Sequence, residues 1–246
     1  MNTTRRRLLQ TCVFLPWLGL VSTQTHAQAH TQTQAQTGAT DLLGAISGPE
    51  AAQALRDSLE RGAGNAIARL GRENGFFADP KLKIGLPKNF AKAEGILRGL
   101  GHGQKVDDLV LAMNRAAETA APQAKNLLLA AVESMSIDDA KAILSGGDNA
   151  ATDYFRKTTE TQLAEQLMPL IKSVTAQSDL ARSYKALAGA LAKYGLKSEQ
   201  STVEGYVNKK ALDGIYRAIG EEERNLRANP TQHAGSLLGK VFGLLK

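Results

Sequence analysis

Apolar residues recur at the spacing of an α-helix through one long stretch of the chain, residues 104–166. In its first part, Val106, Leu109 and Met113 fall three or four positions apart, which places them on one face of a helix. Pro122 interrupts the pattern, because proline lacks the backbone N–H and clashes with the preceding helical turn. A chain with this periodicity is expected to form several amphipathic helices that pack against one another.

Further helices are indicated beyond this stretch. Residues 203–219 place an apolar side chain at every fourth position, and residues 237–245 form a last amphipathic segment. Ser136 and Asp139 have the spacing of a capping box, in which side chains bind the first backbone N–H groups of a helix. The sequence therefore predicts an all-α fold, a single multi-helix, bundle-like domain over residues 41–246.

One segment departs from helical spacing. Between Phe76 and Pro87, the apolar residues Leu82, Ile84 and Leu86 alternate with polar or small ones, which is the period of an extended chain. We expect a short extended arm from Phe76 to Pro87 that lies on the helices. Pairing with a second strand is left open at this point, but the chain offers too little alternating sequence for a sheet.

The first 29 residues have the features of a signal peptide. Three consecutive arginines precede a short apolar run, and the small residues Ala27 and Ala29 fit the positions before a cleavage site. The twin-arginine route and the general secretory route both fit this leader. Residues 30–40 are rich in Gln and Thr without apolar periodicity, so we expect a flexible linker. The expected location is the bacterial periplasm.

Charge and cysteine content narrow the class of protein. The net charge of +6 includes the three arginines of the leader, and no acidic residue precedes Asp41, so removing the leader leaves +3. An excess this small, and not clustered, argues against nucleic acid as a partner. Cys12, the one cysteine, also lies in the leader, so the expected mature chain has no disulfide and no thiolate. No segment after the leader is long and apolar enough to be a transmembrane helix.

Five polar residues stand out as candidates for a ligand-binding site. Asn114, Arg115 and Glu118 lie on one predicted helix beside its apolar face, and Asp153 and Arg156 lie on a later one. A guanidinium in a pocket could bind an anionic ligand through two parallel hydrogen bonds. The alternative is a network of ion pairs and hydrogen bonds that fixes helix packing, and the sequence favours this structural role for most of the five.

Catalytic and metal-binding motifs are absent from the sequence. Asp138, Asp139 and Asp148 lack the spacing of a calcium loop, and their positions suit the N-termini of helices, where negative charge is stabilising. His102 and His233 have no second ligand at metal-binding spacing. There is no Gly-x-Ser-x-Gly elbow and no phosphate-binding loop. We therefore predict no catalytic residue, no cofactor and no metal.

Several short segments carry a family resemblance: residues 79–87, 106–108, 113–118, 139–144, 148–155, 210–214 and 221–230. Together they resemble a bacterial family of exported proteins catalogued as domain of unknown function 4197. The resemblance covers most of residues 41–243 and implies a helical fold and export. It implies no reaction and no catalytic residue.

Two classes of function remain open from the sequence. The first is a non-enzymatic binding or interaction domain for a small apolar or amphipathic ligand, or for an envelope protein, with its oligomeric state undetermined. The alternative is an enzyme with a carboxylate and arginine site in a cleft between helices. The positions of five side chains distinguish the two classes: Arg115, Glu118, Asp153, Arg156 and Asp213. Convergence in an open concavity favours an enzyme or a site for a polar ligand, and closed pairwise contacts argue against it.

Overall fold

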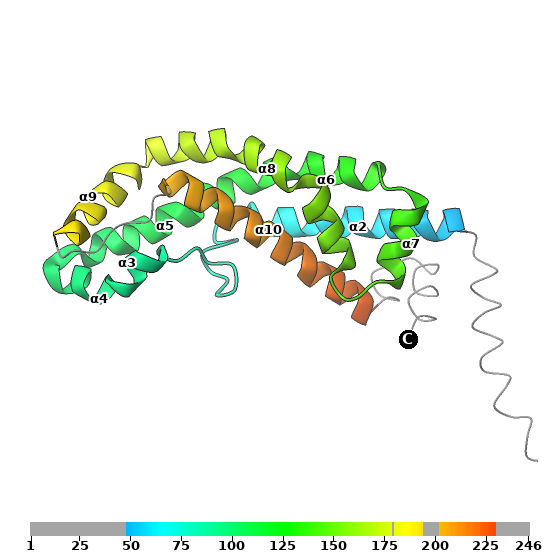
Figure 1. Ribbon diagram of the computed structural model, residues 1–246, viewed down its shortest axis with the longest axis horizontal. Coiled ribbons are helices and arrows are strands. Elements are labelled where there is room, and N and C mark those ends of the chain that lie inside the picture. The colour runs from blue at the N-terminus through cyan, green and yellow to red at the C-terminus, as the bar shows by residue number, and fades with distance from the viewer. Residues whose placement is uncertain (1–47, 179, 194–201, 230–246) are drawn as a thin grey trace, which may run out of the picture. The chain divides into compact units, whose positions relative to one another are not determined.

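The computed structural model describes residues 48–178, 180–193 and 202–229. The chain divides into two compact units, Met1–Thr40 and Asp41–Lys246, and every described residue belongs to the second. The described residues form helices joined by short connections and a single longer loop, with no β-strand among them (Figure 1). The predicted all-α fold is confirmed, whereas the amphipathic segment 237–245 lies outside the described residues.

The helices follow the punctuation of the sequence. Pro122 lies in a short 3-10 turn that bends the chain between two longer helices. The elements in chain order are α2 (Gly48–Leu70), α3 (Lys88–Lys92), α4 (Glu94–Leu97), the π-helical turn η1 (Arg98–His102), α5 (Gly103–Ala120), the 3-10 turn η2 (Ala121–Gln123), α6 (Ala124–Glu133), α7 (Ile137–Ser145), α8 (Ala150–Gln177), α9 (Leu180–Ala192) and α10 (Val203–Ala228).

The predicted capping box forms at the start of α7. The Ser136 hydroxyl oxygen accepts a hydrogen bond from the Asp139 N–H at 3.0 Å, and the Asp139 carboxylate accepts one from the Ser136 N–H at 3.1 Å. The Ser136 hydroxyl also donates to the same carboxylate, which holds the pKa of Asp139 below its ordinary value. One of the acidic pair 138–139 is thus used as a helix cap.

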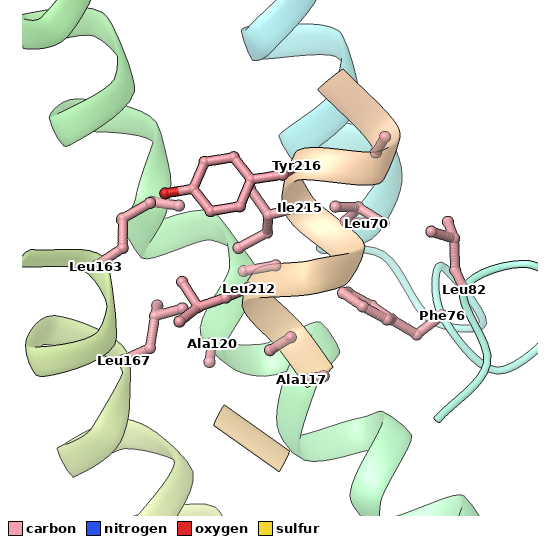
Figure 2. Packing of buried hydrophobic residues seen from close by; sticks show 14 of the residues in the cluster. Leu70, Phe76, Leu82, Ala117, Ala120, Leu163, Leu167, Leu212, Ile215 and Tyr216 are labelled. Carbon is pink, nitrogen blue, oxygen red and sulfur yellow. The ribbon is translucent and has the colours of Figure 1, made fainter. Parts of the chain in front are cut away.

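Helix α10 lies at the centre of the described helices, packed against α8 and α2 (Figure 1). The apolar residues at every fourth position of residues 203–219 are all buried, as their spacing predicts. Figure 2 shows Leu212 and Tyr216 of α10 on the side that faces Leu163 and Leu167 of α8. Full burial of each such side chain stabilises the fold by about 1.5–3 kcal/mol, so the α8–α10 contact is a major part of the core.

The segment between α2 and α3 contains the predicted arm, but the chain is not extended throughout Phe76–Pro87: most of residues 73–82 are turns, and only residues 83–87 run without them. Leu82 and Ile84 are buried while Lys81 and Lys83 are exposed, so the expected alternation is confirmed. The N–H groups of Leu82 and Lys83 both donate to the carbonyl of Asp79, which makes this part of the arm a tight turn. No described residue pairs with the arm as a strand; several of its other backbone groups are bound by side chains of α5 and α10.

Phe76 anchors the arm under α10. Its side chain is fully buried and lies against the helix at Gly214 (Figure 2). A Cβ atom at position 214 would lie 2.4 Å from Cε1 of Phe76, which is closer than real Cβ contacts. The absence of a side chain at Gly214 is therefore what allows the phenyl ring to pack there.

Candidate functional site

Asn114 and Glu118 fasten the arm to α5. They are four residues apart, so both side chains point from the same face of the helix. The Asn114 amide accepts a hydrogen bond from the Ile84 N–H at 2.8 Å and donates to the Ile84 carbonyl at 2.9 Å. One carboxylate oxygen of Glu118 accepts from the N–H groups of Phe76 and Phe77, both at 3.0 Å. Both side chains are buried, and each binds backbone groups of the arm.

Arg115 completes this first cluster from the solvent side. Its guanidinium donates to the second carboxylate oxygen of Glu118 at 2.5 Å, to Glu73 at 3.1 Å and to the side-chain oxygen of Asn74 at 3.0 Å. Asn74 has a left-handed backbone with φ of 66°, so Arg115 also holds an unusual turn. Three acceptors already surround the guanidinium. The cluster of Asn114, Arg115 and Glu118 therefore has the geometry of a structural network.

A second buried carboxylate was missed by the sequence reasoning. Glu223 of α10 accepts hydrogen bonds from the N–H groups of Ala151 and Thr152, both at 2.9 Å, and from the Thr152 hydroxyl at 2.7 Å. Arg227 pairs with Glu223 at 2.9 Å. Glu223 thereby caps the N-terminus of α8 from another helix, where negative charge and N–H groups stabilise each other.

This arrangement corrects the expectation that Asp148 caps α8. The N-cap residue is Asn149, and its side chain makes no capping hydrogen bond. The carboxylate of Glu223 supplies that bond across the helix contact instead. A sequence signal for it existed, because Glu223 continues the four-residue stripe that runs through Ile215 and Ile219.

Asp153 and Arg156 lie apart from the first cluster, in an open concavity between α8 and α10. We call it the α8–α10 groove; its volume is about 320 Å³. Helix α8 and the residue before it contribute Asn149, Thr152, Asp153 and Arg156. Helix α10 contributes Asp213, Tyr216, Arg217, Gly220 and Arg224. The structure thus brings Asp153 and Arg156 together with Asp213, but not with Asn114, Arg115 and Glu118.

Arg156 is held in place within the groove. Its guanidinium binds Glu160 at 3.1 Å, lies 3.8 Å from the Asp213 carboxylate and sits 4.5 Å above the ring of Tyr216. The Tyr216 hydroxyl points inward and shares a hydrogen bond of 2.9 Å with Thr159. Burial raises the pKa of Tyr216 above its ordinary value of 10.0. The phenol is neutral at physiological pH and acts as the floor under Arg156.

Two charged groups of the groove have no partner among the described residues. Asp153, on α8, is exposed and accepts no side-chain hydrogen bond or ion pair, and Arg217, on α10, is exposed and donates none. Arg224 donates to the side-chain oxygen of Asn149 at 3.0 Å but faces no carboxylate. Opposite charges on two facing helices therefore remain available to a molecule that enters the groove.

The part of the chain that the structure describes holds neither a cluster of metal-ligating side chains nor a helix able to span a membrane. No group of three or more His, Cys, Asp or Glu side chains there is placed to hold a metal ion. Likewise, none of its helices combines the length and the apolar character needed to cross a bilayer. What the described residues offer is a structural cluster under the arm and a charged groove open to solvent.

Comparison with known proteins gives a family and nothing narrower. The family model described as "Protein of unknown function (DUF4197)" matches residues 45–243, which includes both clusters and the arm. Neither a curated protein nor a solved structure matches the chain. The match covers most of the sequence, and the chain belongs to the DUF4197 family.

Proposed function

We propose that this protein is an exported, non-enzymatic binding protein that holds a small ligand by a charged head group in the α8–α10 groove. The observation that carries the proposal is the pair of unpartnered charges, Asp153 and Arg217, on the two walls of one open concavity. A ligand that matches these charges gains charge-assisted hydrogen bonds, which are about twice as strong as neutral ones.

A charged head group suits the groove better than a wholly apolar ligand does. The apolar side chains of Tyr216 and its neighbours are packed into the core, whereas the groove lining is dominated by Asp, Arg and amide groups. A larger hollow of about 470 Å³ between α6 and α8 carries no ionisable side chain; it is lined by Gln123, Asn126, Leu127, Ala130, Gln166 and Leu170. That hollow offers a ligand only amide hydrogen bonds and a small apolar area.

Binding is favoured over catalysis because the reactive groups of the groove are engaged. The Thr152 hydroxyl donates to Glu223, and the Tyr216 hydroxyl is bonded to Thr159. A nucleophile needs an adjacent base that is free to take its proton. The Glu223 carboxylate beside Thr152 already accepts from two backbone N–H groups and pairs with Arg227. The Tyr216 hydroxyl has only another hydroxyl as its partner. The carboxylates of Asp153 and Asp213 remain, and in an open groove they serve to orient a ligand.

Thermal unfolding with a panel of small molecules tests this proposal. Succinate, choline and glycine betaine represent anionic, cationic and zwitterionic ligands, and maltose is the neutral comparison. A ligand at about 100 times its Kd stabilises the folded state by about 2.7 kcal/mol, which raises Tm by several degrees in a domain of this size.

The double variant Asp153→Asn, Arg217→Gln should lose the response, because it keeps the shape of the groove and removes its two unpartnered charges. Arg72→Gln is the matched control, since Arg72 is exposed, outside the groove and without a described side-chain interaction. A response to maltose alone, or one that persists unchanged in the double variant, would overturn the proposal.

Export to the periplasm is part of the same proposal and has its own test. The arginines, the apolar run and the small residues Ala27 and Ala29 support cleavage of a leader. The N-terminal sequence of the protein recovered from the periplasmic fraction should begin at His30, or at Gln28 if the cleavage follows Ala27. A protein that keeps Met1 and remains in the cytoplasm would contradict export.

A further inference from the structure

We infer that the head group recognised by the α8–α10 groove is an oxyanion, a carboxylate or a phosphate, held by Arg217 and Arg224 on either side of Gly220. This inference rests on the proposed function, because it names the ligand chemistry of the same groove.

The spacing of the three residues puts them in one row. Positions 217, 220 and 224 are separated by three and four residues, so all three lie on the same side of α10. At about 1.5 Å of rise per residue, the two arginines start about 10 Å apart along the helix axis. Their long side chains can therefore converge above the glycine between them.

Gly220 leaves the floor of this row without a side chain. A Cβ atom there would lie 3.3 Å from the Thr152 hydroxyl oxygen and 3.4 Å from a guanidinium nitrogen of Arg224. These positions are tighter than ordinary contacts, so the space above the backbone is already narrow for an alanine. The missing side chain lets the Thr152 hydroxyl and the Arg224 guanidinium lie against α10, which keeps the guanidinium inside the groove.

Most N–H donors of Arg217 and Arg224 have no hydrogen-bond acceptor among the described residues. A guanidinium carries five N–H donors. Arg217 has no acceptor among the described residues, and Arg224 has only the amide oxygen of Asn149. The amide nitrogen of that asparagine also has no described acceptor. Donors thus outnumber acceptors around Gly220, and a group made of acceptors alone fits this site.

The charge of the groove points the same way. Its lining holds three arginines against two aspartates. Arg156 is already matched by Glu160 and Asp213, which leaves two arginines and the single carboxylate of Asp153. The charge without an ion-pair partner is therefore positive around Arg217 and Arg224. Asp153, on the other wall, repels a long run of negative charge, so the groove suits a small oxyanion rather than a polyanionic strand.

Isothermal titration of the full mature chain with inorganic phosphate and with succinate, at constant ionic strength set by sodium chloride, tests the inference. The wild type should bind at least one of the two. Arg217→Gln and Arg224→Gln should each weaken that binding about tenfold or more, because each removes charge-assisted hydrogen bonds. Arg72→Gln removes the same charge elsewhere and should change Kd by less than about twofold, as exposed charges contribute little.

Co-sedimentation with vesicles separates the two sources of a phosphate. If the group belongs to a lipid, vesicles of phosphatidylglycerol and phosphatidylcholine should retain the wild type and release both arginine variants, while pure phosphatidylcholine retains neither. If the ligand is a free molecule, the titration shows binding and both vesicles leave the protein in solution. Either result supports an oxyanion at Arg217 and Arg224.

Three results would overturn the inference. The first is that phosphate and succinate bind the wild type no better than chloride does. The second is that they bind the arginine variants equally well. In the third, choline raises Tm through Asp153, while phosphate and succinate do not; the binding function then stands and the oxyanion assignment fails. Circular dichroism melting of each variant confirms that the fold is retained, as expected for exposed arginines.

Discussion

Replacement of Glu118 by alanine should destabilise the protein more than loss of any exposed charge. The Glu118 side chain is buried, and it accepts hydrogen bonds from the N–H groups of Phe76 and Phe77 and from Arg115. Truncation leaves two backbone donors unsatisfied and a guanidinium without its buried partner. An unsatisfied buried donor costs about 1–3 kcal/mol, and breaking a buried ion pair costs about 3–5 kcal/mol. We expect the free energy of unfolding to fall by about 3–5 kcal/mol.

Urea unfolding followed by circular dichroism measures this loss, and amide hydrogen exchange locates it. Exchange should accelerate first at Phe76, Phe77 and the rest of the arm, because Glu118 binds those N–H groups directly. Glu73→Gln is the matched control: Glu73 pairs with the same arginine but its side chain is 78% exposed, so the expected loss is below about 1 kcal/mol. If Glu118→Ala costs no more than Glu73→Gln, or if the arm stays protected, the structural role of this cluster is refuted.

Three further predictions follow from the packing, capping and burial of single residues. Gly214→Ala should lower the free energy of unfolding by about 1–3 kcal/mol, because the new Cβ overlaps the ring of Phe76; Gly64→Ala, with open space around its Cβ, should not destabilise the protein in the same urea titration. Ser136→Ala should cost about 1 kcal/mol through the lost cap, seen as a lower Tm, and an unchanged Tm would contradict the capping role. The pKa of Tyr216 is higher in the folded than in the unfolded state, so its contribution to stability is complete below about pH 10 and is lost as the pH rises through the folded pKa. Unfolding free energies measured between pH 9 and 11 should therefore fall less steeply in Tyr216→Phe than in the wild type, and equal slopes would contradict the shift.

The local features of the fold could be predicted from the sequence because each depends on neighbouring residues. The bend at Pro122 follows from the missing N–H of proline, and the capping box at Ser136 follows from a hydroxyl and a carboxylate three residues apart. The alternation of Leu82 and Ile84 with lysines likewise gave the exposed and buried sides of the arm. In each case the relevant contacts are made within a few positions of the chain.

The groove depends on contacts between residues about 60 positions apart, and these could not be predicted. Asp153 and Arg156 were identifiable as polar residues beside an apolar stripe, but their meeting with Asp213 depends on how α8 is aligned along α10. Arg217 and Arg224 give no signal on their own, because exposed arginines are common on helices. Their significance comes from Gly220 between them and from the absence of carboxylate partners, which are properties of the assembled pair of helices.

The cap of α8 was predicted wrongly because a distant residue takes the place of a local one. The sequence offers Asp148 as a local cap, and a local rule selects it. The structure uses Glu223 instead, because the first turn of α8 lies against α10 and a carboxylate on the stripe of α10 reaches it directly. Competition between a local and a distant acceptor is decided by packing, which the sequence alone does not display.

Native mass spectrometry of the protein recovered from the periplasmic fraction shows whether an oxyanion is bound in the α8–α10 groove. Part of the wild-type protein should carry a small bound molecule with a carboxylate or phosphate group. The Arg217→Gln and Arg224→Gln variants should lose this molecule, and Arg72→Gln should keep it. Oxyanion binding is contradicted if the wild-type protein shows only the mass of the unliganded chain and gains no mass with added phosphate or succinate. It is also contradicted if both groove variants retain the bound molecule.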